Sequence, residues 1–260
     1  MKFCNTLMIL FFVMGLVSVA GAQDKMSKTF EQVEFDSADG LKITADLYKA
    51  HDDKATPFIV LCHQANWSRG EYREIAPKLN KMGFNCVAID QRSGKQTPAN
   101  KVDNETTKRA AAAGKDVGFT DAEQDMVAAV KWAKKNHASG KVVLWGSSYS
   151  SALALKIAGD NPDMIDGVLA FAPGEYFGRF GKPQDYVTSS AKKIKVPSFI
   201  TSAKNEKKSW SGIHEAIPGD KKVSFLPKTK GNHGSRALWE EFGDHKDYWK
   251  EVKGFLKQFK

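Results

Sequence analysis

One stretch constrains the fold more than any other, because a strand-like run passes directly into a helix-like run. Residues 142–145 are apolar, and apolar residues recur at helical spacing from Tyr149 onward. Between them lies the pattern Gly-x-Ser-x-Ser, formed by Gly146, Ser148 and Ser150. A sharp strand-to-helix turn can hold a serine hydroxyl above a sheet edge if the residues two before and two after it are small. The pattern therefore predicts a nucleophile turn with Ser148 at its tip.

Three neighbouring serines compete for this role. Ser147 would place the bulky Tyr149 at the crowded second position after it, and Ser150 and Ser151 would lie inside the helix. Gly-x-Ser-x-small patterns also occur by chance in chains of this size, so the context must decide.

The first 22 residues are typical of a secretory signal peptide. Lys2 gives a basic start, residues 6–18 are almost wholly apolar, and Ala-Gly-Ala at 20–22 is a small-x-small cleavage site. The alternative is an uncleaved anchor over residues 3–22. We expect cleavage after Ala22, a secreted or periplasmic location, and no stable membrane insertion of the mature chain.

Residues 23–260 have the size and composition of a single globular domain. The apolar fraction of the whole chain is 42%, which excludes wholesale disorder. The net charge is +9, and removing the one charge of the leader, Lys2, leaves +8. The lysines are scattered and form no arginine-rich stripe with interleaved aromatics, so no nucleic-acid partner is expected.

The sequence carries no recognisable metal or cofactor pattern. It lacks His-x-His, HExxH, paired CxxC and a glycine-rich phosphate loop after a strand. Cys62 and Cys86 lie in apolar runs, where buried free thiols are the simpler interpretation, although a disulfide is open to them. We therefore expect neither a metal nor a cofactor.

Strand-like and helix-like runs alternate along the chain. Residues 30–36 and 41–48 alternate apolar and polar side chains around an Asp-Gly turn, which predicts an antiparallel hairpin. The strands predicted after it are 57–62, 84–89, 142–145, 167–172, 196–201 and 222–226. Helices are predicted between them. This order predicts an α/β fold with a mostly parallel central sheet, an N-terminal antiparallel hairpin and helices on both faces.

Four segments carry more specific expectations. Residues 71–82 have helical spacing, and Thr120-x-x-Glu123 matches a capping box that would open a helix ending near Asn136. A long amphipathic helix is predicted from Ser235 onward. Residues 92–119 are polar and long for a loop, which is typical of a functional or mobile segment.

A serine nucleophile requires a base and an acid that orients the base. His233 lies in a Gly-flanked loop after the last predicted strand, where reactive groups of such sheets collect. For the acid, Asn205 falls at the offset where an aspartate often sits, but an amide cannot stabilise an imidazolium by charge. We therefore predict Glu206 as the acid, with Asn205 as the alternative partner of His233.

The oxyanion of an acyl-transfer reaction requires two N–H donors. Tyr149, directly after the serine, would supply one. The loop after the strand ending at Cys62 would supply the other, from Ala65 first and Gln64 next. Trp67, Tyr149 and Tyr176 are candidates for the substrate pocket, although ordinary packing explains such aromatic residues equally well.

The chain resembles the α/β-hydrolase superfamily over about residues 30–258. The resemblance rests on Gly146-x-Ser148-x-Ser150, the acid segment 202–206 and Gly231-x-His233-Gly234, in the order serine, acid, histidine. His63-Gln64 and the turn at 90–94 are most similar to dienelactone-hydrolase-like and prolyl-oligopeptidase-like hydrolases and secreted esterases.

The sequence departs from that pattern at three points. Ser150 replaces a glycine, Asn205 occupies the usual acid position, and Ser148 stands where dienelactone hydrolases proper have cysteine. The resemblance implies a serine hydrolase whose partner is a small-molecule carboxylic ester. The alternatives are a serine peptidase and a non-catalytic binding module on the same fold.

Overall fold

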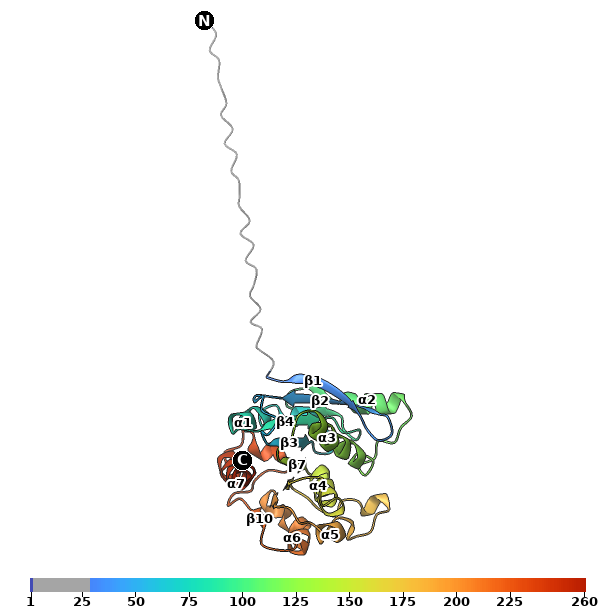
Figure 1. The fold of residues 1–260 in the computed structure, drawn as a ribbon, viewed down its shortest axis with the longest axis vertical. Helices are drawn as coiled ribbons and strands as arrows, with labels where there is room; N and C mark the ends of the chain where they lie inside the picture. Colours follow the sequence, from blue (N-terminus) through green and yellow to red (C-terminus); the bar gives the residue numbers. More distant parts are fainter. Residues whose placement is uncertain (2–28) are drawn as a thin grey trace.

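An eight-stranded sheet organises the chain, in the strand order β1-β2-β4-β3-β7-β8-β9-β10 (Figure 1). The computed structural model describes Met1 and residues 29–260, so the predicted signal peptide lies outside the described residues. The strands are β1 (Glu31–Asp36), β2 (Lys42–Tyr48), β3 (Phe58–Cys62), β4 (Asn85–Ile89), β7 (Val142–Ser147), β8 (Gly167–Phe171), β9 (Ser198–Thr201) and β10 (Lys222–Phe225).

The sheet is parallel except at its N-terminal edge. The β1–β2 and β2–β4 pairs are antiparallel, and every pair from β4 through β3, β7, β8 and β9 to β10 is parallel. The predicted N-terminal hairpin and mostly parallel sheet are therefore confirmed.

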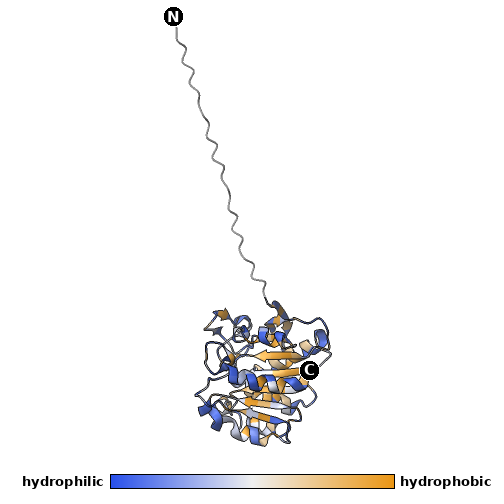
Figure 2. Cartoon of the chain, turned by 90° about the vertical axis from the view of Figure 1, so that its left-hand side faces the viewer, coloured by the Kyte–Doolittle hydropathy of each residue, from blue (hydrophilic) through white to orange (hydrophobic). Residues whose placement is uncertain are grey.

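Helices cover both faces of the sheet. One hydrophobic core contains residues of α3 (Glu123–Asn136), α4 (Tyr149–Asp160), α5 (Tyr186–Ala191) and α6 (Lys207–Ala216). The other contains residues of α1 (Ala76–Lys81) and α7 (His245–Leu256). Along β3, Phe58, Val60 and Cys62 face the first core, whereas Ile59 and Leu61 face the second. Figure 2 shows the strands as a hydrophobic layer between more hydrophilic helices.

Cys62 and Cys86 are both free and buried. They lie on the adjacent strands β3 and β4 but belong to the cores on opposite faces of the sheet, which keeps their thiols apart. No helix in the described part of the chain is both long enough and apolar enough to cross a bilayer.

Two helix predictions are wrong at their N-termini. Helix α3 begins at Glu123 after Ala122, without a side-chain cap, because the Glu123 carboxylate accepts from Lys156 at 3.0 Å instead of closing a capping box. Ser235 opens only the short 3-10 helix η4 (Ser235–Leu238), and α7 follows at His245. The chain turns at Trp239, which is extended and donates its indole N–H to the Glu71 carbonyl at 2.9 Å.

The predicted helix at 71–82 is also divided. Its start is the 3-10 helix η1 (Arg69–Tyr72), and α1 follows after a short interval. Residues 92–119 contain the two-residue strands β5 (Gln96–Thr97) and β6 (Val102–Asp103) and the helix α2 (Glu105–Ala112). The segment is therefore structured over much of its length.

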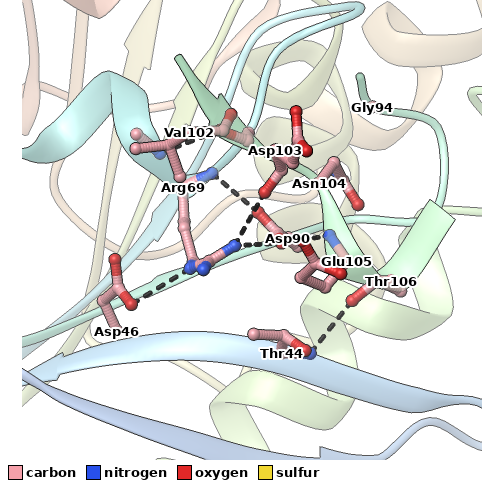
Figure 3. Close-up of polar contacts among 12 residues, drawn as sticks. Thr44, Asp46, Arg69, Asp90, Gly94, Val102, Asp103, Asn104, Glu105 and Thr106 are labelled. Atoms are coloured by element: carbon pink, nitrogen blue, oxygen red, sulfur yellow. Dashed lines mark hydrogen bonds and ion pairs between the residues drawn. The ribbon is translucent and has the colours of Figure 1, made fainter. Parts of the chain in front are cut away.

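A buried ionic cluster ties this segment to η1 (Figure 3). Asp90, at the end of β4, accepts from Arg69 Nη1 at 2.5 Å and from the backbone N–H of Glu105 at 2.8 Å. Arg69 also donates to Asp46 at 3.0 Å and to the Asp103 carbonyl at 2.9 Å. Because these groups are buried, their mutual pairing fixes the start of η1 beside the carboxyl end of the sheet.

Candidate active site

The strand β7 turns into α4 at Ser148, whose backbone lies in the positive-φ region at φ 58° and ψ −124°. Such strain is characteristic of nucleophile turns. A Cβ on Gly146 would lie 2.3 Å from the Ser150 carbonyl oxygen, so this position requires glycine. Ser150 is tolerated at the second small position because its hydroxyl donates to the Cys62 carbonyl at 2.8 Å.

The hydroxyls of the three competing serines are all engaged. Ser147 donates to Glu71 at 2.7 Å, Ser150 to the Cys62 carbonyl, and Ser151 to the Ser148 carbonyl at 2.6 Å. Ser148 alone among the four has positive φ, and its hydroxyl donates to no carboxylate or carbonyl in the described part of the chain. The geometry therefore singles out Ser148.

His233 and Glu206 meet although they come from different loops. His233 follows β10 between Gly231 and Gly234, which both have positive φ, and Glu206 ends the 3-10 helix η3 (Lys204–Glu206) after β9. The Nδ1 atom of His233 lies 2.5 Å from Oε1 of Glu206. The second carboxylate oxygen accepts from the backbone N–H of Ala203 at 3.0 Å, which holds the acid in place.

Asn205 does not occupy this position. Its side chain is exposed, and it makes no side-chain hydrogen bond among the described residues. The structure thus brings the predicted acid, Glu206, to the predicted base and leaves the alternative outside.

The histidine loop packs against the serine turn. The backbone N–H of Ser235 donates to the Ser147 hydroxyl at 2.8 Å, and a Cβ on Gly234 would lie 2.5 Å from the same oxygen. No hydrogen bond joins the Ser148 and His233 side chains in the described residues. Contacts of this kind often tighten only when substrate binds.

The two predicted donors of the loop after β3 differ in availability. The N–H of Gln64 donates to Glu71 Oε2 at 2.7 Å. The prediction of Gln64 as an oxyanion donor is therefore corrected, because its amide is committed to a buried carboxylate. The N–H groups of Ala65 and Tyr149 donate to no acceptor in the described part of the chain. These two amides remain the candidate donors to the oxyanion.

His63 braces the same loop. It is fully buried, with Nδ1 2.8 Å from the Gln64 carbonyl, and its Nε2 accepts from the backbone N–H of Gln91 at 3.1 Å. Burial lowers the pKa of His63 to about 4, which keeps the ring neutral and suited to this bridging role.

Two of the three predicted pocket aromatics, Trp67 and Tyr176, differ in their surroundings. The Trp67 ring stacks on Trp239 with centroids 5.5 Å apart, so ordinary packing accounts for much of its placement. The Tyr176 hydroxyl donates to the Ala172 carbonyl at 2.6 Å. Burial and the charge of Glu206 raise the pKa of Tyr176, and a hydrogen bond from Ser148 opposes them, which places this phenol beside the serine.

A cavity of about 340 Å³ borders the loop after β3 at Asn66. Its apolar wall is formed by Val117, Phe119 and Phe180. The Phe119 ring lies 4.7 Å from that of Tyr149, the residue directly after Ser148. The segment 92–119 therefore contributes to the surroundings of the serine turn.

Glu71 is a site residue that the sequence reasoning missed. It is fully buried and contacts both the loop after β3 and the serine turn. A signal was present, because helical spacing puts residue 71 on the same face as Ile75 and Leu79. A carboxylate on an apolar face is a candidate functional group.

The sheet topology and the strand-end placement of these groups define an α/β-hydrolase fold. The family described as serine aminopeptidase, S33, matches residues 53–178. The esterase Pf2001 of Pyrococcus furiosus superposes with a TM-score of 0.68 at 20% identity, covering 88% of this chain and 92% of that chain.

Two further solved structures agree with this assignment. The dienelactone hydrolase of Anabaena variabilis has a TM-score of 0.65 at 16% identity, with 89% of this chain and 99% of that chain covered. The α/β hydrolase GrgF from Penicillium sp. has a TM-score of 0.66 at 16% identity, with 88% and 98% covered. No curated protein matches the sequence. The predicted α/β-hydrolase fold is therefore confirmed. The matched family agrees with the resemblance to the α/β-hydrolase superfamily.

Proposed function

We propose that this protein is a serine hydrolase that cleaves carboxylic esters, with Ser148 as nucleophile, His233 as base and Glu206 as the acid that orients it. The observation that carries the proposal is the convergence of a strained serine turn and a histidine–carboxylate pair at one edge of the sheet. The matched family, described as serine aminopeptidase, supports a serine hydrolase. The esterases among the structural neighbours support an ester as the substrate.

The reaction follows from the positions of these groups. Ser148 Oγ attacks the ester carbonyl carbon while its proton passes to Nε2 of His233, and the amides of Ala65 and Tyr149 donate to the oxyanion. The tetrahedral intermediate collapses, and the leaving alcohol takes the proton from His233. Water, deprotonated by His233, then cleaves the acyl-enzyme and releases the acid and Ser148. Glu206 holds Nδ1–H throughout and stabilises the transient imidazolium.

The substrate class is a small-molecule ester. A cavity of about 340 Å³ beside the loop after β3 is near the lower end of the range for ligand pockets. Its wall of Val117, Phe119 and Phe180 suits an apolar acyl or alcohol group. Tyr176, beside the serine, is a second candidate wall residue.

The place of action is proposed to be outside the cytoplasm. The support is the sequence of residues 1–22, with its basic start, apolar centre and Ala-Gly-Ala site. Intact mass of the chain recovered from a secreting host tests this, because cleavage after Ala22 would leave Gln23 as the first residue. A chain that retains residues 1–22 would contradict it.

A fluorophosphonate probe tests the mechanism, because it reacts only with an activated serine. We expect one adduct by intact mass on the chain lacking residues 1–22, no adduct on Ser148→Ala, and slower labelling of Glu206→Gln. The same proteins are assayed with p-nitrophenyl esters of graded acyl length and with aminoacyl p-nitroanilides as the peptidase comparison. Folded wild-type protein that takes no label and cleaves no ester would overturn the proposal.

A further inference from the structure

Glu71 is a buried carboxylate without a cationic partner. Its side chain is fully buried in η1, and no lysine, arginine or histidine forms an ion pair with it among the described residues. Carboxylates are rarely buried unless paired. An unpaired buried carboxylate beside a proposed active site is therefore a candidate functional group.

The carboxylate joins three segments of the proposed active site. Oε2 accepts from the N–H of Gln64 at 2.7 Å, and Oε1 accepts from the Ser147 hydroxyl at 2.7 Å. The same Ser147 oxygen accepts from the backbone N–H of Ser235 at 2.8 Å. Glu71 thus contacts two segments directly: the loop that carries Ala65, and Ser147, the residue before the proposed nucleophile. It is linked to the segment after His233 through the Ser147 hydroxyl.

The surroundings of Glu71 make its charge sensitive to pH. Burial raises its pKa to about 7, against the opposing effects of the hydrogen bonds from Ser147 and Gln64 and of the charge on His233. Tyr72, next to it on η1, is a further titratable side chain that interacts with this charge. The groups that donate to the carboxylate from the other elements, Gln64 and Ser147, are neutral.

We propose that Glu71 is a positioning residue of the active site, which holds the oxyanion loop, the serine turn and the histidine loop in register and places a second negative charge near His233. Its contacts suit both tasks. The bond to Gln64 fixes the amide next to Ala65, and the bond to Ser147 fixes the residue next to Ser148. The charge stabilises the imidazolium that forms during acyl transfer, in addition to Glu206.

This inference rests on the proposed function, and the two can fail separately. Failure of the wild type to take the fluorophosphonate label would remove the proposed function. If the wild type is labelled and the Glu71 variants show the same labelling rate and pH dependence, only the inference about Glu71 is overturned.

The test measures the fluorophosphonate labelling rate of the chain lacking residues 1–22 between pH 5 and 9. In Glu71→Gln, which keeps the shape but loses the charge, we expect a rate loss on the order of 10- to 100-fold. We also expect the midpoint of the acid limb to move to lower pH, because in the wild type this limb also follows the ionisation of Glu71, whose pKa is about 7, and glutamine does not ionise. A purely structural role would lower the rate without moving this midpoint.

Two further variants complete the design. Ser147→Ala breaks the link to the histidine loop but keeps the carboxylate, so the rate should fall with little movement of the midpoint. Asp166→Asn is the matched control, because Asp166 accepts from the N–H of Val142 at the opposite end of β7, at 2.8 Å. Asp166→Asn should change neither the labelling rate nor the midpoint of the acid limb.

The outcomes are decisive in either direction. Folded Glu71→Gln with the wild-type rate and midpoint overturns the proposal. If Glu71→Gln does not fold, Ser147→Ala decides, and a wild-type labelling rate in that variant overturns it.

Discussion

The Nδ1 atom of His233 lies 2.5 Å from Oε1 of Glu206, while the neighbouring Asn205 is exposed. Because the carboxylate holds Nδ1, it sets the tautomer in which Nε2 can accept the serine proton. Glu206→Gln should therefore lower kcat/KM for p-nitrophenyl esters by about 100-fold or more. Asn205→Ala, one residue away, should change it little. Equal losses in the two variants would show that the acid has been misassigned.

The serine turn depends on close backbone packing at Gly146. A methyl group there would lie 2.3 Å from the Ser150 carbonyl oxygen, which cannot yield as a flexible side chain could. Gly146→Ala should lower the free energy of unfolding by about 1–3 kcal/mol and also reduce activity. Gly178→Ala is the control, because a Cβ there meets nothing within 4 Å. Urea unfolding of both variants checks this, and similar midpoints would contradict it.

Local patterns were enough to predict much of the fold and of the candidate site. Apolar runs predicted the strands, and the tendency of reactive groups to collect at strand ends selected Ser148, His233 and the segment holding Glu206. The capping box at Thr120 failed because Lys156, 33 residues beyond Glu123, binds that glutamate in the folded chain. A local sequence pattern cannot show that a distant lysine competes for the capping glutamate.

The role of Glu71 was hidden for the same reason. Its partners Ser147 and Trp239 lie 76 and 168 residues away, and only the folded sheet brings them together. The commitment of the Gln64 amide to this carboxylate was equally invisible, so the choice between Ala65 and Gln64 could not be made from the sequence.

The Arg69–Asp90 pair should be important for stability. Both groups are buried, and Asp90 accepts from the backbone of both η1 and α2. Asp90→Asn should lower the free energy of unfolding by roughly 3–5 kcal/mol, because it leaves Arg69 incompletely paired in the interior. Breaking the exposed Lys42–Asp36 pair with Asp36→Asn should have little effect. Chemical denaturation of the two variants would contradict this prediction if Asp36→Asn were the less stable.

The aromatic cavity should affect specificity more than chemistry. Phe119 packs between Tyr149 and Phe180, with ring centroids 4.7 and 5.5 Å away. Phe119→Ala should raise KM for esters with bulky apolar groups several-fold and leave acetate esters nearly unchanged, because it removes apolar contact area. A uniform change in KM across the series would show that the cavity lies outside the substrate path.

Glu71 should also leave a signature in the pH dependence of folding. Its pKa rises from the ordinary value of 4.5 to about 7 in the folded chain, mainly because of burial. The native state therefore binds more protons than the unfolded state between these values, so the stability that this group contributes falls as the pH rises through the window. Each unit of pKa difference corresponds to about 1.4 kcal/mol, so its full contribution is about 3 kcal/mol. Urea unfolding at pH 4.5 and 7.5 should show the wild type losing stability relative to Glu71→Gln by an amount of this order. A difference between the two proteins that stays constant with pH would mean that Glu71 ionises normally in the folded chain.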